Sequence, residues 1–442
     1  MLDRLDRLVA RPELERRIVA IILALGFVAR IVWLFLDPAT RLGPHRSEMW
    51  HVAATFAQTG AIGGAYTPDS GPSSHVGPFN PIVGGLVYRA LGVGTPAAEV
   101  ALAVIAGAII AALFWVLYRV AARLGVAPVP RLAALVLLAL VPLNFYVEAV
   151  DFRIREGGLA ALLGAGLLLW TLDLDRRGPL TLRAVAGFGL AAGFAFLINP
   201  GIALGAYAGL GLVALRHMRW QRWLPAALLL AAGFAIVNGP WIARNAIVYD
   251  RFMPSRGNFG LELDTAYHAA AVHPADPRAV FVARSQEIHP FFSAAAYARF
   301  KTFPNDATYF DTLGVEAKQW IAAHPGESAG ITLRHLRELY FPPLWLFDQY
   351  GVGKSNLLVK LAIVWATTAL ALAAIVVGLR EAPRRFVFVV LTMVFPTLLY
   401  IIVQPTLRYR YAFTELLTFL AAGLVWRLIG GRRVVPVEGV AR

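Results

Sequence analysis

The sequence predicts an all-α integral membrane protein with about ten transmembrane helices. Of its 442 residues, 58% are hydrophobic and only 15% are charged, whereas a soluble globular chain carries about 25% charged residues. Several runs, among them RIVAIILALGFVARIVWLFL and AAEVALAVIAGAIIAALFWVLY, approach the ~20 apolar residues that cross a bilayer as one helix. The chain has no cysteine, which excludes disulfides and thiolate metal sites.

Ten apolar segments carry this prediction. Proline removes a helix donor, so Asn199-Pro200 divides the fifth segment from the sixth. The run PIVGGLVYRALG at 81–92 is too short to cross the membrane, and we expect it to form a helix at the interface. The expected spans are residues 18–36, 97–118, 131–147, 157–173, 184–198, 200–215, 223–242, 355–378, 385–403 and 411–428.

The basic residues set the predicted orientation. The net charge of +14 is compatible with nucleic-acid binding, but an arginine excess is typical of the cytoplasmic loops of membrane proteins. When the N-terminus is placed in the cytoplasm, each inner loop holds two or more arginines. The preference for arginine over lysine is typical of a high-GC bacterial gene. We therefore expect a multi-pass protein of the bacterial inner membrane, with both termini cytoplasmic and no nucleic-acid partner.

This topology divides the chain into three regions. Residues 1–244 form an N-terminal transmembrane module, which includes a first periplasmic loop at 37–80. Residues 245–354 lie between the seventh and eighth spans and form a small periplasmic domain. Residues 355–442 form the last spans and a cytoplasmic tail.

Two short outer loops break the charge pattern. The stretches VDFRIRE and QPTLRYR each contain an Arg-x-Arg spacing, with Arg153 and Arg155 in the first and Arg408 and Arg410 in the second. One explanation is that these arginines lay their stems along apolar surface and keep their charged heads at the interface. The repetition in two loops instead favours an anionic ligand at the outer leaflet, such as a lipid phosphate, which guanidinium groups bind bidentately.

The first outer loop supplies an acidic residue. Ser47 can cap a short helix that runs to about Thr59, with Glu48 in its first turn. A glutamate there commonly stabilises the helix dipole, but a carboxylate beside a membrane-surface pocket could also take a proton from an attacking hydroxyl. The residues alone leave both roles open. We expect the apolar side of this helix to lie on the membrane surface; it consists of Met49, Val52, Ala53 and Phe56.

Four motifs follow one another along most of the chain. The first is an acidic residue after the first span followed by MWHVAATFAQTG and, further on, SSHVGPFNPIVGGLVYRALG, and the second is the cluster DFRIRE. The third is the segment GPWIARNAIVYDRFMPSRGNFGLEL (239–263), and the fourth is the entry into the last span, LRYRYAFTELLTFLAAG (407–423). Together they resemble the bacterial membrane glycosyltransferases of the family-39 type. That family shares the GT-C fold with protein O-mannosyltransferases, lipid A aminoarabinose transferases and lipopolysaccharide-core glycosyltransferases.

The resemblance implies a GT-C-like polytopic bundle that moves a sugar from a polyprenyl-phosphate donor, with inversion, to a hydroxyl on the periplasmic side. Glu48 takes the place of the family's proposed base, and Asp151 lies near a second acidic position that could orient the acceptor or an arginine. The acceptor, which is a glycan, a lipid or a protein, is left open. The basic residues that hold the donor phosphate correspond to Arg153, Arg155, Arg408 and Arg410.

Three further residues have less specific expectations. His75 lies in the first outer loop and is expected to be solvated or to contact substrate, because the histidines there lack metal-ligand spacing. Arg244 ends the seventh span, where it can bond helix-end carbonyls or contact the donor. Arg30, inside the first span, could reach the phosphate or the interface. We expect no metal and no cofactor, because a lipid phosphate is already an activated leaving group.

The sequence departs from the family pattern at two places. Many relatives carry Asp-Glu where this chain has Ser47-Glu48, and Arg-Pro where it has Asn199-Pro200. A catalytically inactive homologue is therefore one alternative. A transporter or flippase of a lipid-linked glycan is another. Such folds commonly show inverted repeats, and the sequence has a single helix break without a counterpart.

Overall fold

The computed structural model describes residues 6, 11–44, 46–348 and 357–430. These residues form helices and no β-strand, and the one β contact among them is an isolated bridge between Gly63 and Pro72. The prediction of an all-α integral membrane protein is thereby confirmed. Most of the expected cytoplasmic tail and the first positions of the span expected at 355–378 lie outside the described residues.

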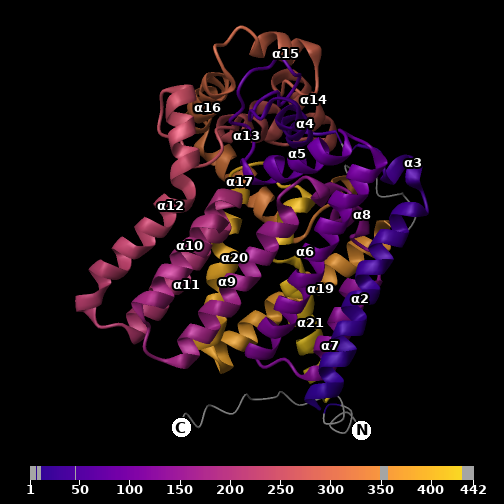
Figure 1. Cartoon of the computed structure of the whole chain (residues 1–442), viewed down its shortest axis with the longest axis vertical. Helices are drawn as coiled ribbons and strands as arrows, with labels where there is room; N and C mark the ends of the chain where they lie inside the picture. The colour runs from indigo at the N-terminus through magenta and orange to yellow at the C-terminus, as the bar shows by residue number, and fades with distance from the viewer. Residues whose placement is uncertain (1–5, 7–10, 45, 349–356, 431–442) are drawn as a thin grey trace.

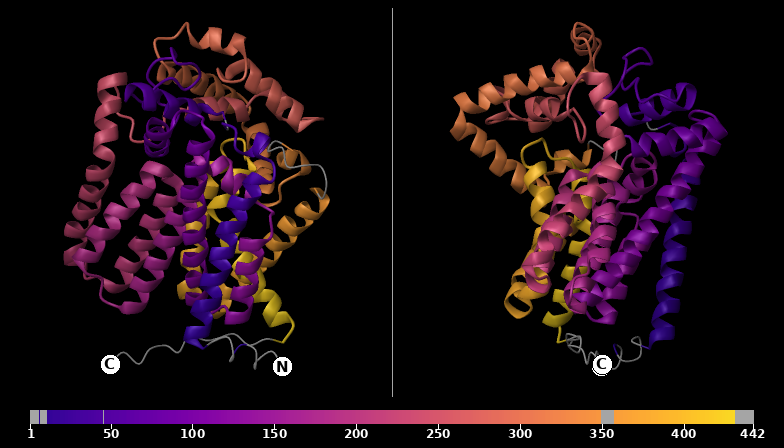
Figure 2. Two further views of the ribbon diagram at one scale, coloured as in Figure 1. Left: turned by 45° about the vertical axis from the view of Figure 1, so that its right-hand side comes forward. Right: turned by 60° about the vertical axis from the view of Figure 1, so that its left-hand side comes forward.

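The long helices form a bundle, and a layer of shorter helices lies across one end of it (Figures 1 and 2). Helix α2 begins and α21 ends at the opposite end. Helices α10 and α12 pack along each other on one side, while α2 packs on α6 and α7 on the other. The bundle helices are α2 (Pro12–Phe35), α6 (Pro96–Arg123), α7 (Pro128–Leu140), α9 (Gly157–Arg177), α10 (Leu182–Ile198), α11 (Pro200–His217), α12 (Trp223–Tyr249), α19 (Leu357–Glu381), α20 (Pro383–Tyr400) and α21 (Thr414–Leu428).

The number of helices able to cross a membrane is smaller than predicted. Within the described residues, six helices are long and apolar enough, and a seventh is counted if the bent pair α7 and α8 (Phe145–Ala149) forms one span. The expected ten spans are therefore only partly confirmed. Helices do occur at the remaining predicted positions, but α10 has 17 residues and α21 has 15, and both are shorter than the ~20 residues of a typical span.

The third expected span is broken after α7, which meets the following helical stretch Phe145–Arg153 at an angle of 65°. The break frees the last carbonyl groups of α7, and such groups need partners inside a membrane. Arg30 supplies them: its guanidinium donates to the carbonyls of Ala139 at 2.8 Å and Leu138 at 3.0 Å. Its Nε also donates to Glu148 at 2.6 Å. Arg30 thus reaches neither a phosphate site nor the interface, because it is 2% exposed and fully used within the bundle.

We call the layer across the end of the bundle the cap. Its helices come from the two regions predicted to lie outside the membrane and, for α5, from the segment predicted to lie at the interface. Helix α5, predicted at 81–92, lies between α4 and the bundle helix α6. The cap comprises α3 (Pro38–Arg41), α4 (Glu48–Thr59), α5 (Phe79–Leu91), α13 (Phe259–Ala266), the short turn η3 (Ala269–Ala271), α14 (Pro277–Ile288), α15 (Ala294–Phe300), α16 (Asp306–Ala323), α17 (Pro325–Tyr340) and α18 (Leu344–Asp348).

Helix α4 is packed inside the cap. Its side chains Met49, Val52 and Ala53 are at most 5% exposed and belong to one apolar cluster with residues of α5, α13 and α16. The expectation that this face lies on the membrane surface is therefore wrong, because other cap helices cover it. On the α5 side the two helices touch closely: a Cβ atom at Gly85 would lie 2.8 Å from the carbonyl oxygen of Ala53. Only glycine fits there.

Short helical turns connect the bundle to the cap and carry the predicted arginine loops. The stretch VDFRIRE continues from α8 into η1 and ends at the start of α9. The stretch QPTLRYR leads from α20 into η4, which is followed directly by α21. Helix η4 packs against α9, so the two loops lie side by side. The turns of the two arginine loops are η1 (Asp151–Arg153) and η4 (Leu407–Ala412), and a further turn, η2 (Trp220–Arg222), lies between the bundle helices α11 and α12.

Candidate functional site

Glu48 stands at the N-terminus of α4, as the sequence predicts. The Ser47 hydroxyl accepts a hydrogen bond from the backbone N–H of Trp50 at 3.2 Å and caps the helix, and the helix ends at Thr59. Because the opposite face of α4 is packed in the cap, the Glu48 side chain has a fixed direction. It is 13% exposed, so it lies at the wall of a polar site and not in open solvent.

His75 reaches the same place from the loop that follows α4. The loop is held by Asp306 at the start of α16. The Oδ2 of Asp306 accepts from the backbone N–H of Ser74 at 2.6 Å and from the Ser73 hydroxyl at 3.2 Å. The His75 imidazole lies 3.1 Å from the Tyr66 hydroxyl through Nδ1. The side chain is thus fixed by residues of both cap segments.

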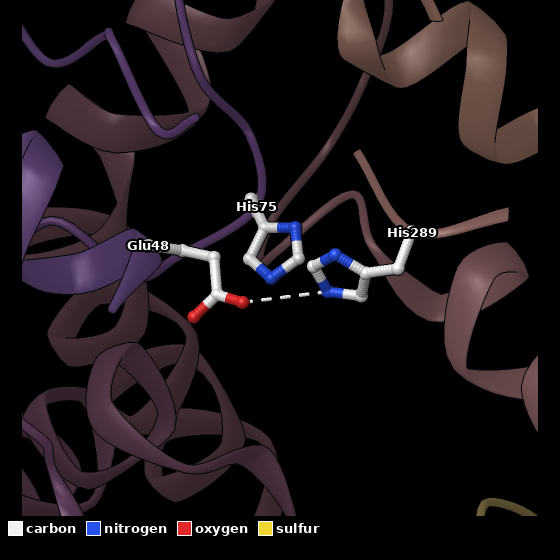
Figure 3. Close-up of side chains that lie close together, drawn as sticks. All are labelled: Glu48, His75 and His289. Carbon is white, nitrogen blue, oxygen red and sulfur yellow. Dashed lines mark ion pairs between the residues drawn. The ribbon is translucent and has the colours of Figure 1, made fainter. Parts of the chain in front are cut away.

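His289 completes the group from the second cap segment, directly after α14. Its Nε2 lies 3.4 Å from Oε1 of Glu48, and its ring centroid lies 5.4 Å from that of His75. Figure 3 shows the carboxylate and the two imidazoles pointing toward one another from different elements. We refer to Glu48, His75 and His289 as the Glu48 group.

The buried environment sets the charges of this group. Burial by itself raises the pKa of Glu48, but His289, His75 and Arg155 lower it to about 2. Burial lowers the pKa of His75 to about 3 and also lowers the pKa of His289, although Glu48 acts in the opposite direction. Both imidazoles are therefore neutral at neutral pH, and Arg155 is the cation that persists there and keeps the carboxylate ionised.

An ionised carboxylate with two neutral imidazoles can accept a proton or hold a cation. The three ligand atoms lie within 4.8 Å of one another, and carboxylate and neutral imidazole are donors that Zn²⁺ takes in catalytic sites. The Glu48 group could thus hold a metal ion, which there would polarise a substrate oxygen. The expectation of no metal rested on the activated leaving group and on the histidine spacing within the first loop, whereas the structure adds His289 from a distant segment.

A second polar element lies where the two arginine loops meet. A pocket of about 30 Å³ is lined by Arg155 from the first loop and Arg408 from the second, with Tyr400, Tyr409 and Glu156 around them. The Arg408 guanidinium lies over the Tyr409 ring, 5.4 Å from its centroid, and within the described residues it forms no ion pair. We call this the arginine pocket. Its open guanidinium suits an anionic ligand.

Neighbouring acids position the cations of the arginine pocket. Asp151 is buried and pairs with Arg155 at 3.0 Å, so it orients that arginine. Glu156 forms an ion pair with Arg256, which comes from the segment after α12. The arginine pocket is therefore built by both halves of the chain.

Glu262 on α13 adds a second carboxyl group beside the Glu48 group. Burial, followed by the charge of Glu48, raises its pKa to about 7, against the lowering effects of Arg256 and Arg155. Its Oε1 accepts from the Asn258 amide at 3.1 Å. At neutral pH a substantial fraction of Glu262 is protonated, so that the site can contain one carboxylate and one carboxylic acid.

Two of the predicted phosphate contacts lie elsewhere. Arg153 is 5% exposed and pairs with Glu99 of α6 at 2.9 Å, while its Nη2 donates to the carbonyl of Arg41 at 2.9 Å. Contact with a substrate would require this pair to open. Arg410 is 4% exposed and faces a different cavity from Arg408. The Arg-x-Arg spacing thus points its two members in different directions.

Arg244 connects the end of α12 to the first cap segment. Its Nη2 donates to the carbonyl of Ile62 at 2.9 Å, and its Nη1 donates to the Asn245 side chain at 2.9 Å. The guanidinium also lies over the rings of Trp241 and Tyr249. These contacts give Arg244 a supporting role for the loop that carries His75.

Sequence reasoning missed three residues of the site: His289, Glu262 and Arg256. All three lie in the region 245–354. Arg256 and Glu262 fall inside the motif GPWIARNAIVYDRFMPSRGNFGLEL, where no role was assigned to them, whereas His289 lies in a stretch without a recognisable motif. The sequence signal that could have pointed to these residues was a polar side chain next to a helix boundary, and the sequence has many polar residues at such positions. Their contribution depends on contacts with distant residues such as Glu48 and Glu156.

Comparisons with known proteins give distant structural matches only. No protein-family model matches the sequence, and no curated protein does. The oligosaccharyltransferase AglB of Archaeoglobus fulgidus, solved with an inhibitory peptide and a dolichol-phosphate, matches with a TM-score of 0.42 and 14% identity, covering 94% of this chain and 52% of that one. ArnT of Cupriavidus metallidurans, bound to undecaprenyl phosphate, matches with a TM-score of 0.37 and 17% identity, covering 95% of this chain and 78% of that one. The chain spans about half the length of the oligosaccharyltransferase.

Proposed function

We propose that the chain is a membrane glycosyltransferase that moves a sugar from a polyprenyl-phosphate donor to an acceptor hydroxyl, with inversion at the anomeric carbon. The observation that carries the proposal is the convergence of the two arginine loops. Arg155 and Arg408 line one pocket, and the same Arg155 acts electrostatically on Glu48. An anion site and a carboxylate are therefore neighbours at the boundary between cap and bundle.

The chemistry needs a base, an anion site and little else. In the proposed reaction the donor phosphate binds Arg155 and Arg408, which hold the negative charge that grows on the leaving group. The acceptor hydroxyl gives its proton to the Glu48 carboxylate as its oxygen attacks the anomeric carbon from the face opposite the phosphate. The carbon–oxygen bond to the phosphate breaks, and the lipid phosphate leaves with the electron pair. The configuration at the anomeric carbon is inverted.

The neighbouring groups have supporting roles in this proposal. Asp151 positions Arg155 through their ion pair. His289 lies 3.4 Å from Glu48 and can donate an N–H to it while the carboxylate waits for its proton. The protonated fraction of Glu262 can donate a hydrogen bond to a sugar or acceptor oxygen. If a metal ion binds the Glu48 group, it polarises an oxygen there, and Glu48 is then a ligand.

In this proposal the site faces the periplasm. The cap then lies on the side of the membrane opposite the predicted inner loops, which hold most of the arginines, as is typical of cytoplasmic loops. The absence of cysteine makes this directly testable. A single cysteine replacing Lys318, an exposed residue of the cap helix α16, is expected to react in intact cells with a thiol reagent that does not cross the inner membrane. Reaction only after the cells are opened would place the cap in the cytoplasm and invert the proposal.

The donor contact is tested by binding. Replacing Arg155 and Arg408 with glutamine is expected to weaken binding of a polyprenyl-phosphate sugar by at least roughly tenfold per lost charge pair. The matched control replaces Arg176 and Arg177, two exposed arginines at the other end of α9, which changes the charge equally. Equal affinities of the two double variants would remove the arginine pocket as the donor site.

Comparing cell-envelope glycans with and without the gene by mass spectrometry identifies the transferred sugar and its acceptor. A missing residue mass on one glycan, lipid or protein is the expected result. A full set of glycans, with lipid-linked precursors trapped on one side of the membrane, would instead support a flippase.

A further inference from the structure

A second cavity, distinct from the arginine pocket, lies between α7, α8, α19 and α21. It has a volume of about 100 Å³. It occupies the space left by the broken third span, because the residues at the end of α7 and across the break form one wall. Phe347 of the cap helix α18 also lines it, so the cavity lies at the cap end of the bundle. Its apolar walls include Leu137, Leu143, Val147 and Ile363.

Two cations face this apolar cavity. Lys360 stands in the first turn of α19, and Arg410 comes from η4. Within the described residues neither forms an ion pair within 4.0 Å; Glu415 acts on Arg410 only from farther away. Ionisable residues at membrane depth are rare and usually mark a ligand or transport path, so two of them around one cavity indicate a ligand.

The guanidinium of Arg410 has a free donor. Its Nη2 donates to the Thr368 hydroxyl at 2.9 Å, which fixes the side chain against α19. Only 4% of the Arg410 residue is exposed. Its Nη1 is buried and has no hydrogen-bond partner among the described residues. A buried donor without a partner is costly, and an anionic oxygen in the cavity would satisfy it.

The cavity is separated from the arginine pocket by Tyr411, which is the one residue that lines both within the part of the chain that the structure describes. This ring is held rigidly: its hydroxyl donates to Glu148 at 2.6 Å, and its centroid lies 4.5 Å from that of Phe152 in an edge-to-face contact. A ligand in one cavity therefore does not extend into the other without moving Tyr411.

The cavity opens sideways. Val141, at the end of α7, lines it and is 37% exposed, and Leu358, in the same turn as Lys360, is 68% exposed. Exposed apolar residues on a bundle that crosses a membrane face lipid. The mouth of the cavity is therefore on the lipid-facing side, and a molecule would enter it from the membrane.

We propose that this cavity binds a second lipid with a phosphate head, separate from the sugar donor. The phosphate lies between Lys360 and the free Nη1 of Arg410, as guanidinium and ammonium groups bind phosphate oxygens. The tail follows the apolar wall formed by Leu137 and Ile363 and leaves past Val141 into the membrane. This assignment does not depend on the proposed glycosyl transfer.

Native mass spectrometry of the full chain in detergent, with farnesyl phosphate as the probe, tests the proposal. Wild type is expected to bind two molecules, one in the cavity and one in the arginine pocket. Lys360→Gln is expected to weaken the cavity site about tenfold, which corresponds to about 1.4 kcal/mol. Val141→Trp narrows the mouth without changing the charge and is expected to have the same effect.

Control variants separate this site from the arginine pocket. Lys318→Gln, an exposed lysine in the cap, makes the same charge change and is expected to leave both sites intact. Arg408→Gln removes only the arginine-pocket molecule, so its double variant with Lys360→Gln binds none at the same concentration. If Arg408→Gln has no effect while Lys360→Gln does, the donor site is overturned and the cavity site stands.

Two further probes test the chemical class of the ligand. Farnesol lacks the phosphate and inorganic phosphate lacks the tail, so both are expected to bind the cavity at least about tenfold more weakly than farnesyl phosphate. Equal binding of farnesol would show that the cavity recognises only the apolar tail. Equal binding of inorganic phosphate would show that it recognises only the anion. Either result would contradict the proposed phosphate-headed lipid. Unchanged binding of farnesyl phosphate by both Lys360→Gln and Val141→Trp would overturn the proposal.

Discussion

The substitution Glu48→Gln separates the two roles that the sequence leaves open for this residue. Glutamine has nearly the same size and keeps an oxygen that can accept from His289, whose Nε2 lies 3.4 Å from Oε1 of Glu48. The cap of α4 comes from Ser47, and the buried face of the helix is unchanged. The variant is therefore expected to fold, but its amide cannot take a proton.

The expected loss follows from the chemistry of a general base. Proton transfer by a positioned side chain contributes roughly 10²–10⁴ in rate, which corresponds to about 3–5 kcal/mol of activation free energy. We expect kcat for sugar transfer from a polyprenyl-phosphate sugar, measured in proteoliposomes, to fall by such a factor. Donor affinity should change little, because the arginine pocket is intact.

The matched control is Glu327→Gln. Glu327 also stands in the first turn of a helix, α17, and is exposed, so its loss removes a helix-dipole interaction of about 0.3–1 kcal/mol and nothing at the site. Turnover by Glu327→Gln should equal that of wild type. If Glu48→Gln also turns over at the wild-type rate, the reasoning is refuted, and Glu48 is a structural residue at a helix start.

Three other predictions concern stability and ligands. Arg30→Met leaves the carboxylate of Glu148 buried without its cation, which is expected to lower the free energy of unfolding by roughly 3–5 kcal/mol and therefore to lower the Tm. An unchanged Tm would mean that the contacts of Arg30 do not stabilise the break in the third span. The pKa of His75 is about 3 in the folded state and near 6.5 in the unfolded chain. Between these pH values the unfolded state binds more protons, so stability falls as the pH drops below about 6.5. His75→Gln should flatten the curve of Tm against pH, and an identical slope would contradict the burial of a neutral imidazole. Zn²⁺ is expected to raise the Tm of wild type but not of His289→Ala, and equal shifts would place the ion elsewhere.

The sequence predicts local structure well wherever one short segment decides it. The helix that begins after Ser47 ends at Thr59, and the division at Asn199 appears as a capped start of α11, with the Asn199 side chain accepting from the N–H of Ile202. The break in the third span also had a local signal, since Pro142 lies between α7 and α8. The prediction followed the hydropathy of the apolar run at 131–147 and therefore treated it as one continuous span.

Contacts between distant segments decide the rest. The period of apolar residues in α4 shows that one face is buried, but not whether lipid or protein covers it. An Arg-x-Arg spacing shows two cations, but Glu99 pairs with Arg153 from another helix and thereby removes it from the surface. His289 joins the Glu48 group only because the end of α14 lies next to the start of α4. No pattern within either segment specifies that meeting.

The way Asp306 holds the loop around Ser74 has a consequence for biogenesis. Glu48 and His75 are made early, while Asp306 and His289 follow only after the whole first helical module has been synthesised. A chain synthesised only as far as α12 would carry His75 on a loop without the Asp306 carboxylate that holds it, and Glu48 without its neighbour His289. The Glu48 group therefore forms only after the second cap segment has been synthesised and has packed against the first.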